Sequence, residues 1–284
     1  MSFIQRGKMN KLDIRTTKEL NNGVNIPLLG LGTYLNDNGK QAIDSILYAF
    51  EIGYRHIDTA AMYENEKEVG EAVNRSGIPR EEIFITTKLW NSDHGYQNAI
   101  DAFHKSLDKL KLDYVDLYLI HWPVENLRID SWRALEKLCE NGLCKSIGVS
   151  NYMERHIAEL LNNSEITPVI NQVEFSPFLY LKDLKNYCES KNIGFESYSP
   201  LTKGYKLNDL RLIEIANRYN KSTSQILIRW CLQKKVICIP KSSQKKHIKE
   251  NADVFNLNIS KEDMNNLDNL NINYRSTWDP TNVL

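Results

Sequence analysis

Residues 53–70 read GYRHIDTAAMYENEKEVG and contain a strand, a polar loop and the start of a helix in one unit. A short strand-like run, residues 55–57, ends at Asp58, Tyr63 follows in a polar loop, and a helical pattern begins at Glu64. An aspartate at a strand end beside a loop tyrosine suits acid–base chemistry, because a tyrosine whose pKa is shifted can transfer a proton near neutral pH. The simpler interpretation is a strand-to-helix turn with an aspartate cap and a surface tyrosine.

The same strand–loop–helix unit recurs along the chain from Pro27 onward. Strands are predicted at residues 28–31, 55–57, 83–86, 115–120, 146–149, 169–173, 193–198 and 236–239. Helices are predicted at 41–51, 66–74, 96–110, 131–140, 154–161, 181–189, 209–219 and 247–254, with additional helices at 224–233 and 260–267. Short apolar strands that alternate with helices indicate a parallel sheet covered on both faces. We therefore predict an α/β fold, a (β/α)8 TIM barrel, as a single domain over residues 1–284.

The segment before the first repeat has a different pattern. Asn21-Asn22-Gly23 lies between two short runs and predicts a β-hairpin, because Asn-Gly readily adopts positive φ. Residues 1–17 are polar and are predicted to form a loose leader.

Composition excludes several classes of partner. The chain has 284 residues, 42% hydrophobic and 25% charged, with a formal net charge of zero at pH 7. This balance gives no basic surface for nucleic acid. No apolar run approaches the roughly 20 residues that cross a bilayer, and the N-terminus lacks the apolar stretch of a signal peptide. The five cysteines form no CxxC pair, so we expect reduced thiols, no metal site and a cytoplasmic location.

Polar residues fall where the predicted strands end, and in such barrels the chemistry lies at those ends. Lys88 follows the third strand and His121 the fourth. Buried Lys and Asp are rare unless paired, so we expect Asp58 and Lys88 to pair. A lysine near Tyr63 is then expected to lower the pKa of the phenol. His121 is left to bond a substrate oxygen, although a single histidine in such an apolar run is more often a core residue.

At this point the chain resembles the aldo-keto reductase family over nearly its whole length. The resemblance rests on GYRHIDTA at 53–60 with YENE at 63–66, TKLW at 87–90, HWP at 121–123, GVSN at 148–151 and IPKS at 239–242. It implies the same barrel, and it implies that Asp58, Tyr63, Lys88 and His121 are the catalytic residues. The implied reaction is NADPH-dependent reduction of aldehydes and ketones, in which hydride goes to the carbonyl carbon and Tyr63 protonates the oxygen.

The resemblance also implies which residues hold the cofactor. Ser150, Asn151 and Gln172 match the residues that bind the nicotinamide carboxamide. Tyr198 matches the ring that stacks on the nicotinamide, although an ordinary core aromatic is the alternative. The full set is Gly32, Thr33, Ser150, Asn151, Gln172, Tyr198, Ser199, Pro200, Leu201, Lys241, Ser242, Ser243, His247, Glu250 and Asn251.

One cofactor position departs from the family pattern. Where the family usually carries an arginine against the 2′-phosphate, this chain has His247, preceded by Lys245 and Lys246. Arginine offers a permanent charge and a bidentate fork that histidine lacks. No GxGxxG stretch follows a strand, so a doubly wound dinucleotide fold is excluded.

The resemblance further implies an aromatic substrate pocket formed by Tyr34, Trp90 and Trp122. The loop after His121 is short, and fourteen residues follow Leu270. Short loops resemble the microbial branch, with its diketogluconate, methylglyoxal and prostaglandin F synthase-type reductases. We therefore expect an open pocket, a small-molecule carbonyl substrate and a monomer.

Two other functions remain open. Some relatives are non-catalytic subunits that only bind the nicotinamide cofactor, although all four catalytic positions are present here. A phosphate-binding lyase or isomerase on the same barrel is the second alternative. The absence of a glycine-rich loop after the seventh predicted strand argues against it.

Overall fold

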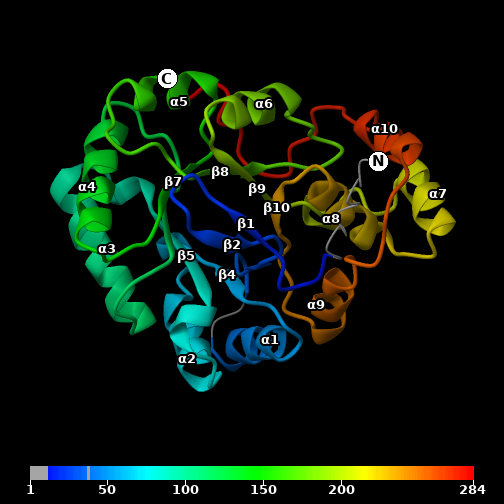
Figure 1. Ribbon diagram of the computed structural model, residues 1–284, viewed down its shortest axis with the longest axis horizontal. Helices are drawn as coiled ribbons and strands as arrows, with labels where there is room; N and C mark the ends of the chain where they lie inside the picture. Colours follow the sequence, from blue (N-terminus) through cyan, green and yellow to red (C-terminus); the bar gives the residue numbers. More distant parts are fainter. Residues whose placement is uncertain (1–11, 37–38) are drawn as a thin grey trace, which may run out of the picture.

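The predicted (β/α)8 barrel is confirmed by the structure, a computed structural model that describes residues 12–36 and 39–284 (Figure 1). The strands of the barrel are β3 (Leu31–Gly32), β4 (His56–Asp58), β5 (Phe84–Leu89), β6 (Leu117–Ile120), β7 (Ile147–Ser150), β8 (Ile170–Glu174), β9 (Gly194–Tyr198) and β10 (Ile237–Ile239). Each strand pairs in parallel with the next in sequence. Parallel bridges from Leu29 to Cys238 and from Gly32 to Lys241 close the ring between the first and last strands.

Helices surround the strands and bury the core between the two layers (Figure 1). They are α1 (Lys40–Glu51), α2 (Glu66–Arg75), α3 (Tyr96–Leu110), α4 (Arg128–Glu140), α5 (Glu154–Leu161), α6 (Lys182–Ser190), α7 (Leu210–Arg218), α8 (Thr223–Gln233), α9 (Lys245–Ala252) and α10 (Lys261–Asp268). Trp132 of α4 and Trp230 of α8 are fully buried in this core. A Cβ at Gly70 would lie 2.0 Å from the carbonyl oxygen of Leu110, so glycine allows α2 to pack against the end of α3. No helix in the described ranges is long and apolar enough to span a membrane.

The predicted hairpin closes the N-terminal end of the barrel. It consists of β1 (Thr17–Glu19) and β2 (Asn25–Pro27), which lie across the middle of the ring of helices in Figure 1. The Asn21 side chain donates hydrogen bonds to the backbone oxygens of Pro168 and Asn192, 3.1 Å away in both cases. Of the predicted leader, residues 1–11 lie outside the described residues. Leu12 and Ile14 pack against the core, so the last part of that segment is attached to the barrel.

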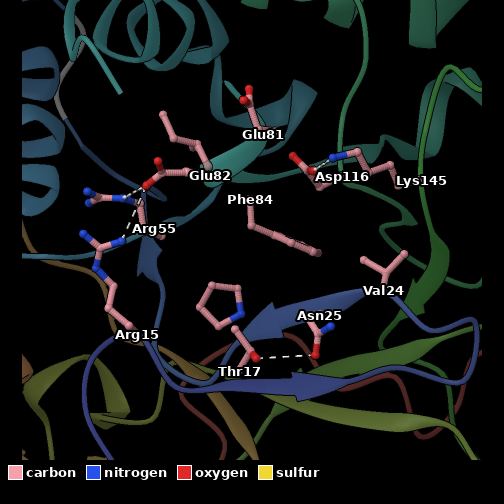
Figure 2. A pocket seen from close by; sticks show the side chains of 12 residues that line it. Arg15, Thr17, Val24, Asn25, Arg55, Glu81, Glu82, Phe84, Asp116 and Lys145 are labelled. Atoms are coloured by element: carbon pink, nitrogen blue, oxygen red, sulfur yellow. Dashed lines mark hydrogen bonds and ion pairs between the residues drawn. The ribbon is translucent and has the colours of Figure 1, made fainter. Parts of the chain in front are cut away.

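A small cavity of about 330 Å³ lies beside the hairpin (Figure 2). Its charged side chains face one another. Arg15 and Arg55 lie 3.8 Å and 3.9 Å from Glu82, and Lys145 lies 2.9 Å from Asp116. The Arg15–Glu82 contact joins the segment just before the hairpin to the segment before β5.

Several predicted boundaries differ from the structure, among them the first strand (predicted 28–31) and the last barrel helix (predicted 247–254), and two others are wrong for the same reason. The third strand was expected to end at Thr86, yet β5 continues to Leu89 through a buried Thr-Thr-Lys run. Helix α4 begins at Arg128, three residues before the predicted Ser131. In both places polar residues are buried because they have partners inside the protein, and a pattern of polar and apolar residues does not reveal partners.

Candidate active site

A cavity of about 990 Å³ opens at the C-terminal ends of the strands, as the barrel predicts. Most of the predicted site residues line it, namely Gly32, Tyr34, Asp58, Tyr63, His121, Trp122, Asn151, Gln172, Tyr198, Ser199, Pro200, Leu201, Lys241, Ser242, His247, Glu250 and Asn251. The size is at the upper end of the range for small-molecule sites, about 300–1,000 Å³.

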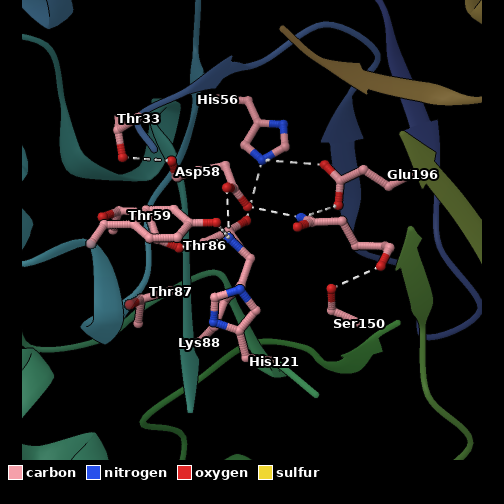
Figure 3. A network of polar contacts seen from close by, with 12 residues as sticks. Thr33, His56, Asp58, Thr59, Thr86, Thr87, Lys88, His121, Ser150 and Glu196 are labelled. Atoms are coloured by element: carbon pink, nitrogen blue, oxygen red, sulfur yellow. Dashed lines mark hydrogen bonds and ion pairs between the residues drawn. The ribbon is translucent and has the colours of Figure 1, made fainter. Parts of the chain in front are cut away.

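The predicted pairing of Asp58 with Lys88 is present at the base of this cavity (Figure 3). The ammonium of Lys88 lies inside the barrel on β5 and is fully buried. It donates to Oδ1 of Asp58 at 2.6 Å, to the backbone oxygen of Thr59 at 2.8 Å and to the hydroxyl of Tyr63 at 3.4 Å. An ammonium has three protons, so these three acceptors use its full donor capacity. Tyr63 is thereby tied to a buried ion pair.

The pKa of Tyr63 differs from the sequence-based expectation. Burial of the hydroxyl raises this pKa well above its usual range, and the negative charge of Asp58 adds to the increase. The prediction that Lys88 lowers it is wrong, because the ammonium is neutralised by the carboxylate 2.6 Å away. The phenol therefore keeps its proton throughout the neutral pH range.

His121 lies opposite Tyr63 on the wall of the cavity. Its ring contacts Tyr63 edge-on at 5.7 Å and Trp90 edge-on at 5.2 Å between centroids. Burial, followed by the nearby charge of Lys88, lowers the pKa of His121 well below its usual value. The imidazole is therefore neutral at physiological pH and presents one N–H donor and one acceptor.

A second polar layer lies beneath the catalytic residues, and the sequence analysis missed it (Figure 3). The amide nitrogen of Gln172 donates to Oδ2 of Asp58 at 2.8 Å and to Oε2 of Glu196 at 3.0 Å. His56 lies 3.8 Å from the other oxygen of Glu196 and 3.2 Å from the hydroxyl of Thr86. A sequence signal existed, because Glu196 is two residues before Tyr198 in the same strand and so points to the same face.

The residues expected around the nicotinamide carboxamide are bonded to one another. The amide of Asn151 donates to the backbone oxygen of His121 at 3.0 Å and to Oγ of Ser150 at 3.1 Å, and it accepts from the Tyr198 hydroxyl at 2.7 Å. Oγ of Ser150 donates to the backbone oxygen of Gln172 at 2.8 Å. Asn151 has φ 64°, a left-handed conformation that asparagine tolerates better than most residues. These contacts fix the direction of Asn151 before any ligand binds.

Some predicted site residues do not line the cavity. Thr33 is fully buried and donates from its hydroxyl to the backbone oxygen of Asp58 at 2.9 Å, so it supports the strand end. Ser150 is buried behind Asn151, and Trp90 stands behind His121. Ser243 also falls outside the lining.

The loop after β9 forms one side of the cavity and is conformationally unusual. Ser199, Thr202 and Lys203 have φ of 47°, 51° and 50°, and none of them is glycine. Such conformations cost about 1–3 kcal/mol each and persist only where surrounding contacts impose them. Lys203 lies over the ring of Tyr34 at 5.6 Å from its centroid. The loop therefore reaches across to the wall formed by Tyr34.

The far end of the cavity is more exposed and more basic. His247 and Lys241 are exposed, and Ser242 is buried beside them. The start of α8 also lines this end with three hydroxyl residues that the sequence analysis missed, Ser222, Thr223 and Ser224. Ser222 is the N-cap residue of α8, and a serine at the predicted start of this helix was the signal in the sequence that could have revealed them.

The C-terminal segment reaches the cavity despite its short length. The buried carboxylate of Glu174 accepts four hydrogen bonds, from the backbone N–H and the hydroxyl of both Ser276 and Thr277, at 2.6–3.1 Å. Trp278 follows and lies 6.1 Å from Trp90 and 6.2 Å from Trp122 between ring centroids. The substrate end is thus bordered by a third tryptophan, and it is less open than the short tail suggested.

The family assignment follows from comparison with known proteins. A model of the aldo/keto reductase family matches residues 28–272. The chain belongs to the aldo/keto reductase family. It is similar to a glyoxal reductase from Bacillus subtilis, with 48% identity over 95% of this chain and 98% of the relative. It is also similar to a 9,11-endoperoxide prostaglandin H2 reductase from Trypanosoma cruzi, with 43% identity over 93% and 94% of the two chains.

Solved structures of aldo-keto reductases match both the fold and its extent. An aldo-keto reductase from a Medee basin deep-sea metagenome superposes with a TM-score of 0.90 at 41% identity, over 94% of this chain and 99% of that one. A Bombyx mori aldo-keto reductase, crystallised in complex with NADP, has a TM-score of 0.86 at 36% identity, over 92% and 94% of the chains. The protein is therefore an NAD(P)-dependent oxidoreductase of the aldo-keto reductase type, and its reaction is carbonyl reduction.

Proposed function

We propose that this aldo-keto reductase uses NADPH to reduce small aldehydes and dicarbonyls, with Tyr63 as the proton donor. The observation that carries this proposal is the position of the Tyr63 hydroxyl, which is bonded to the buried Lys88, in a cavity that His121 lines opposite Tyr63. Proton transfer by a positioned side chain typically contributes about 10²–10⁴-fold to a rate. The arrangement thus supplies an acid, a charge and an orienting group at one point.

Each catalytic residue has a separate task. When bound, a reduced nicotinamide supplies the hydride that adds to the carbonyl carbon. The neutral imidazole of His121 donates a hydrogen bond to the carbonyl oxygen and so orients it. The phenol of Tyr63 then gives its proton to that oxygen, and Lys88 stabilises the negative charge left on the phenolate.

A high pKa for Tyr63 is compatible with this task. An acid must hold its proton before the reaction, and the raised pKa ensures this over the whole neutral range. The acceptor is an oxygen that becomes strongly basic as hydride arrives, so a weak acid suffices. Lys88 contributes by favouring the charged product of proton transfer, in a buried setting where such an interaction is strong.

The cavity fits a nicotinamide cofactor. At the catalytic end, the amides of Asn151 and Gln172 and the flat ring of Tyr198 suit a neutral carboxamide on an aromatic ring. At the far end, Lys241, Ser242 and His247 offer a charge and hydrogen-bond donors to a phosphate. We therefore propose NADPH as the preferred cofactor, and the NADP in the Bombyx mori structure supports this choice.

Small dicarbonyls are the substrates that the pocket favours. Its walls are aromatic, with Tyr34 and Trp122 on the cavity and Trp278 contributed by the tail. An apolar pocket of this kind favours planar carbonyl compounds. The name of the Bacillus subtilis relative, glyoxal reductase, points to the same class.

We also propose that the enzyme acts as a monomer in the cytoplasm. All five cysteines are free, and four of them are buried. Free thiols of this kind are typical of a reducing compartment.

The test is a panel of carbonyls with the purified protein, followed by loss of NADPH absorbance. Glyoxal, methylglyoxal, phenylglyoxal and 4-nitrobenzaldehyde should be reduced with higher kcat/KM than a steroid ketone. Comparable kcat/KM for phenylglyoxal and the steroid would contradict the proposed substrate class. Tight NADPH binding without turnover of any carbonyl would favour the non-catalytic, cofactor-binding alternative.

A further inference from the structure

Glu196 is a buried carboxyl group that the proposed mechanism leaves without a role. It lies in β9 directly across from Gln172 in β8, and both side chains are almost completely buried. The amide of Gln172 gives one hydrogen to Glu196 at 3.0 Å and the other to Asp58 at 2.8 Å. Because Asp58 also binds Lys88, an unbroken chain of hydrogen bonds joins Glu196 to Tyr63.

The charges inside the barrel balance when one of two buried carboxyl groups is neutral, and the 2.6 Å ion pair with Lys88 makes Asp58 the ionised one and leaves Glu196 neutral. Asp58 and Glu196 are two buried carboxyl groups, and among residues 12–36 and 39–284 Lys88 is the one cation that faces both. His56 does not supply a second positive charge, because burial lowers its pKa to about 3. An ionised Glu196 would add an uncompensated negative charge in a low-dielectric interior, which is costly.

The remaining neighbours of Glu196 carry no charge at neutral pH. Cys238 faces it from β10, and burial raises the pKa of this thiol well above its usual value. Tyr63 keeps its proton for the same reason. Oε1 of Glu196 has no hydrogen-bond partner within the described part of the chain, so an oxygen is available to carry the proton.

We propose that Glu196 is a positioning residue for Tyr63, and that it acts as a neutral carboxylic acid. It holds the amide of Gln172 against Asp58 and leaves the charge of Lys88 balanced by Asp58 alone. This inference rests on the proposed function of Tyr63 as the proton donor.

Ionisation of Glu196 should therefore slow the reaction at alkaline pH. Burial and then the charge of Asp58 raise the pKa of Glu196 to about 8. Below this value the acid is neutral. Above it a second negative charge is present, which raises the pKa of Tyr63 further and weakens the phenol as an acid.

The first experiment compares single-turnover rates of carbonyl reduction from pH 6 to 9.5 in wild type and Glu196→Gln. Wild type should lose about tenfold in rate between pH 7 and 9 through one titration. Glu196→Gln keeps an oxygen that accepts from Gln172 and cannot ionise, so its rate should stay flat over that range. Glu196→Asp keeps the acid and should retain the alkaline decrease. Equal alkaline decreases in wild type and Glu196→Gln would overturn the proposal.

A matched control separates this effect from the loss of any buried carboxyl group. Glu136 is a buried glutamate on α4 that accepts from the indole of Trp132, away from the site. Glu136→Gln should keep the alkaline decrease of wild type. A flat profile in this variant as well would mean that the decrease reports stability, and the proposal would fail.

The second experiment does not depend on turnover. Infrared difference spectra of wild type against Glu196→Gln should show a protonated carboxyl band at pH 7 that disappears with a midpoint of about 8. Absence of that band at pH 7 would overturn the proposal even if the enzyme is active. Presence of the band in a protein that binds NADPH but reduces no carbonyl would contradict the proposed function instead, and would leave Glu196 without a proton donor to position.

Discussion

The two ends of the active-site cavity differ in how deeply their charged side chains are buried. At the catalytic end, Asp58 and Lys88 are almost fully buried. They are hydrogen-bonded to each other and to neighbouring protein groups, with donor–acceptor distances of 2.6–2.8 Å. At the far end, Lys241 and His247 are exposed on the loop before α9 and on its first turn. The catalytic groups are thus fixed by buried contacts, whereas the far groups are exposed to solvent.

This difference predicts how each end responds to mutation. Interactions between buried charges are strong and poorly screened by salt, so removing one partner has a large effect. Interactions between exposed charges and a phosphate are screened, so changes there should alter cofactor preference modestly. Four substitutions test this contrast, from the largest expected effect to the smallest.

Tyr63→Phe should abolish carbonyl reduction. The substitution keeps the ring and removes only the transferable proton, so the loss should be at least about 10²-fold. NADPH affinity and the circular dichroism spectrum should remain close to those of wild type. More than about a tenth of the wild-type rate in the variant would exclude Tyr63 as the proton donor.

Lys88→Met should have the next largest effect, and it should depend on Asp58. Removing the ammonium leaves a buried carboxylate without its partner, so activity should collapse and stability should fall by about 3–5 kcal/mol in urea unfolding. Adding Asp58→Asn removes the carboxylate that Lys88→Met leaves unpaired. The double variant should therefore regain stability, while its rate should fall little below that of Lys88→Met, because the two groups act as one unit.

A surface ion pair offers the matched control for that experiment. Arg75 and Glu71 lie 3.0 Å apart on α2, and both side chains are about half exposed (52% and 54%). Arg75→Met should lower the free energy of unfolding by no more than about 1 kcal/mol and should leave activity unchanged.

The Asp58 and Lys88 variants can also contradict the idea of a single unit. Fully additive rate losses in these variants would mean that Asp58 acts by another route, such as packing β4.

The catalytic end was predictable from sequence because burial imposes pairing. A lysine and an aspartate at neighbouring strand ends of a barrel must neutralise each other, and the spacing of Asp58, Tyr63 and Lys88 places them together. The barrel itself followed from the repeated strand–helix pattern. The pKa of Tyr63 was not predictable, because its direction is set first by burial of the hydroxyl and then by the charge of Asp58, and both depend on the tertiary structure.

The residues that sequence reasoning missed were those whose partners lie far along the chain. Glu196 is linked to Asp58 through Gln172, and its spacing from Tyr198 indicates the face of the strand but not these partners. Trp278 is carried to the site by four hydrogen bonds from the preceding two residues to Glu174, about a hundred positions earlier. The pattern of polar and apolar residues along the sequence does not predict such long-range contacts.

Trp278→Ala should have an intermediate effect that depends on the substrate. The ring lies beside Trp90 and Trp122 and is 56% exposed, so it borders the substrate end without forming its base. Aromatic contacts of this kind contribute about 0.5–1.5 kcal/mol, so KM for phenylglyoxal should rise about two- to tenfold. KM for glyoxal should change little, and Trp278→Phe should behave like wild type. An equal rise in KM for both substrates would indicate that the tail acts on the whole site.

His247→Arg should have the smallest effect, on cofactor preference alone. If His247 contacts the 2′-phosphate, it lacks the bidentate fork and permanent charge of an arginine, so the NADPH-over-NADH preference of wild type should be modest. High salt should reduce the preference as well, because the residue is exposed. Arginine stays charged and offers a bidentate contact, so the variant should bind NADPH more tightly.

The measurement for His247 is the dissociation constant of each cofactor, read from tryptophan quenching at low and at high salt. His247→Gln removes the imidazole, so its ratio of NADH to NADPH dissociation constants supplies the baseline. At low salt wild type should exceed this baseline ratio, and His247→Arg should exceed wild type. High salt should bring the three ratios closer together, because exposed charges are screened. If wild type and His247→Gln have equal ratios at low salt, His247 does not contact the phosphate, and the selectivity rests on Lys241 and the buried Ser242.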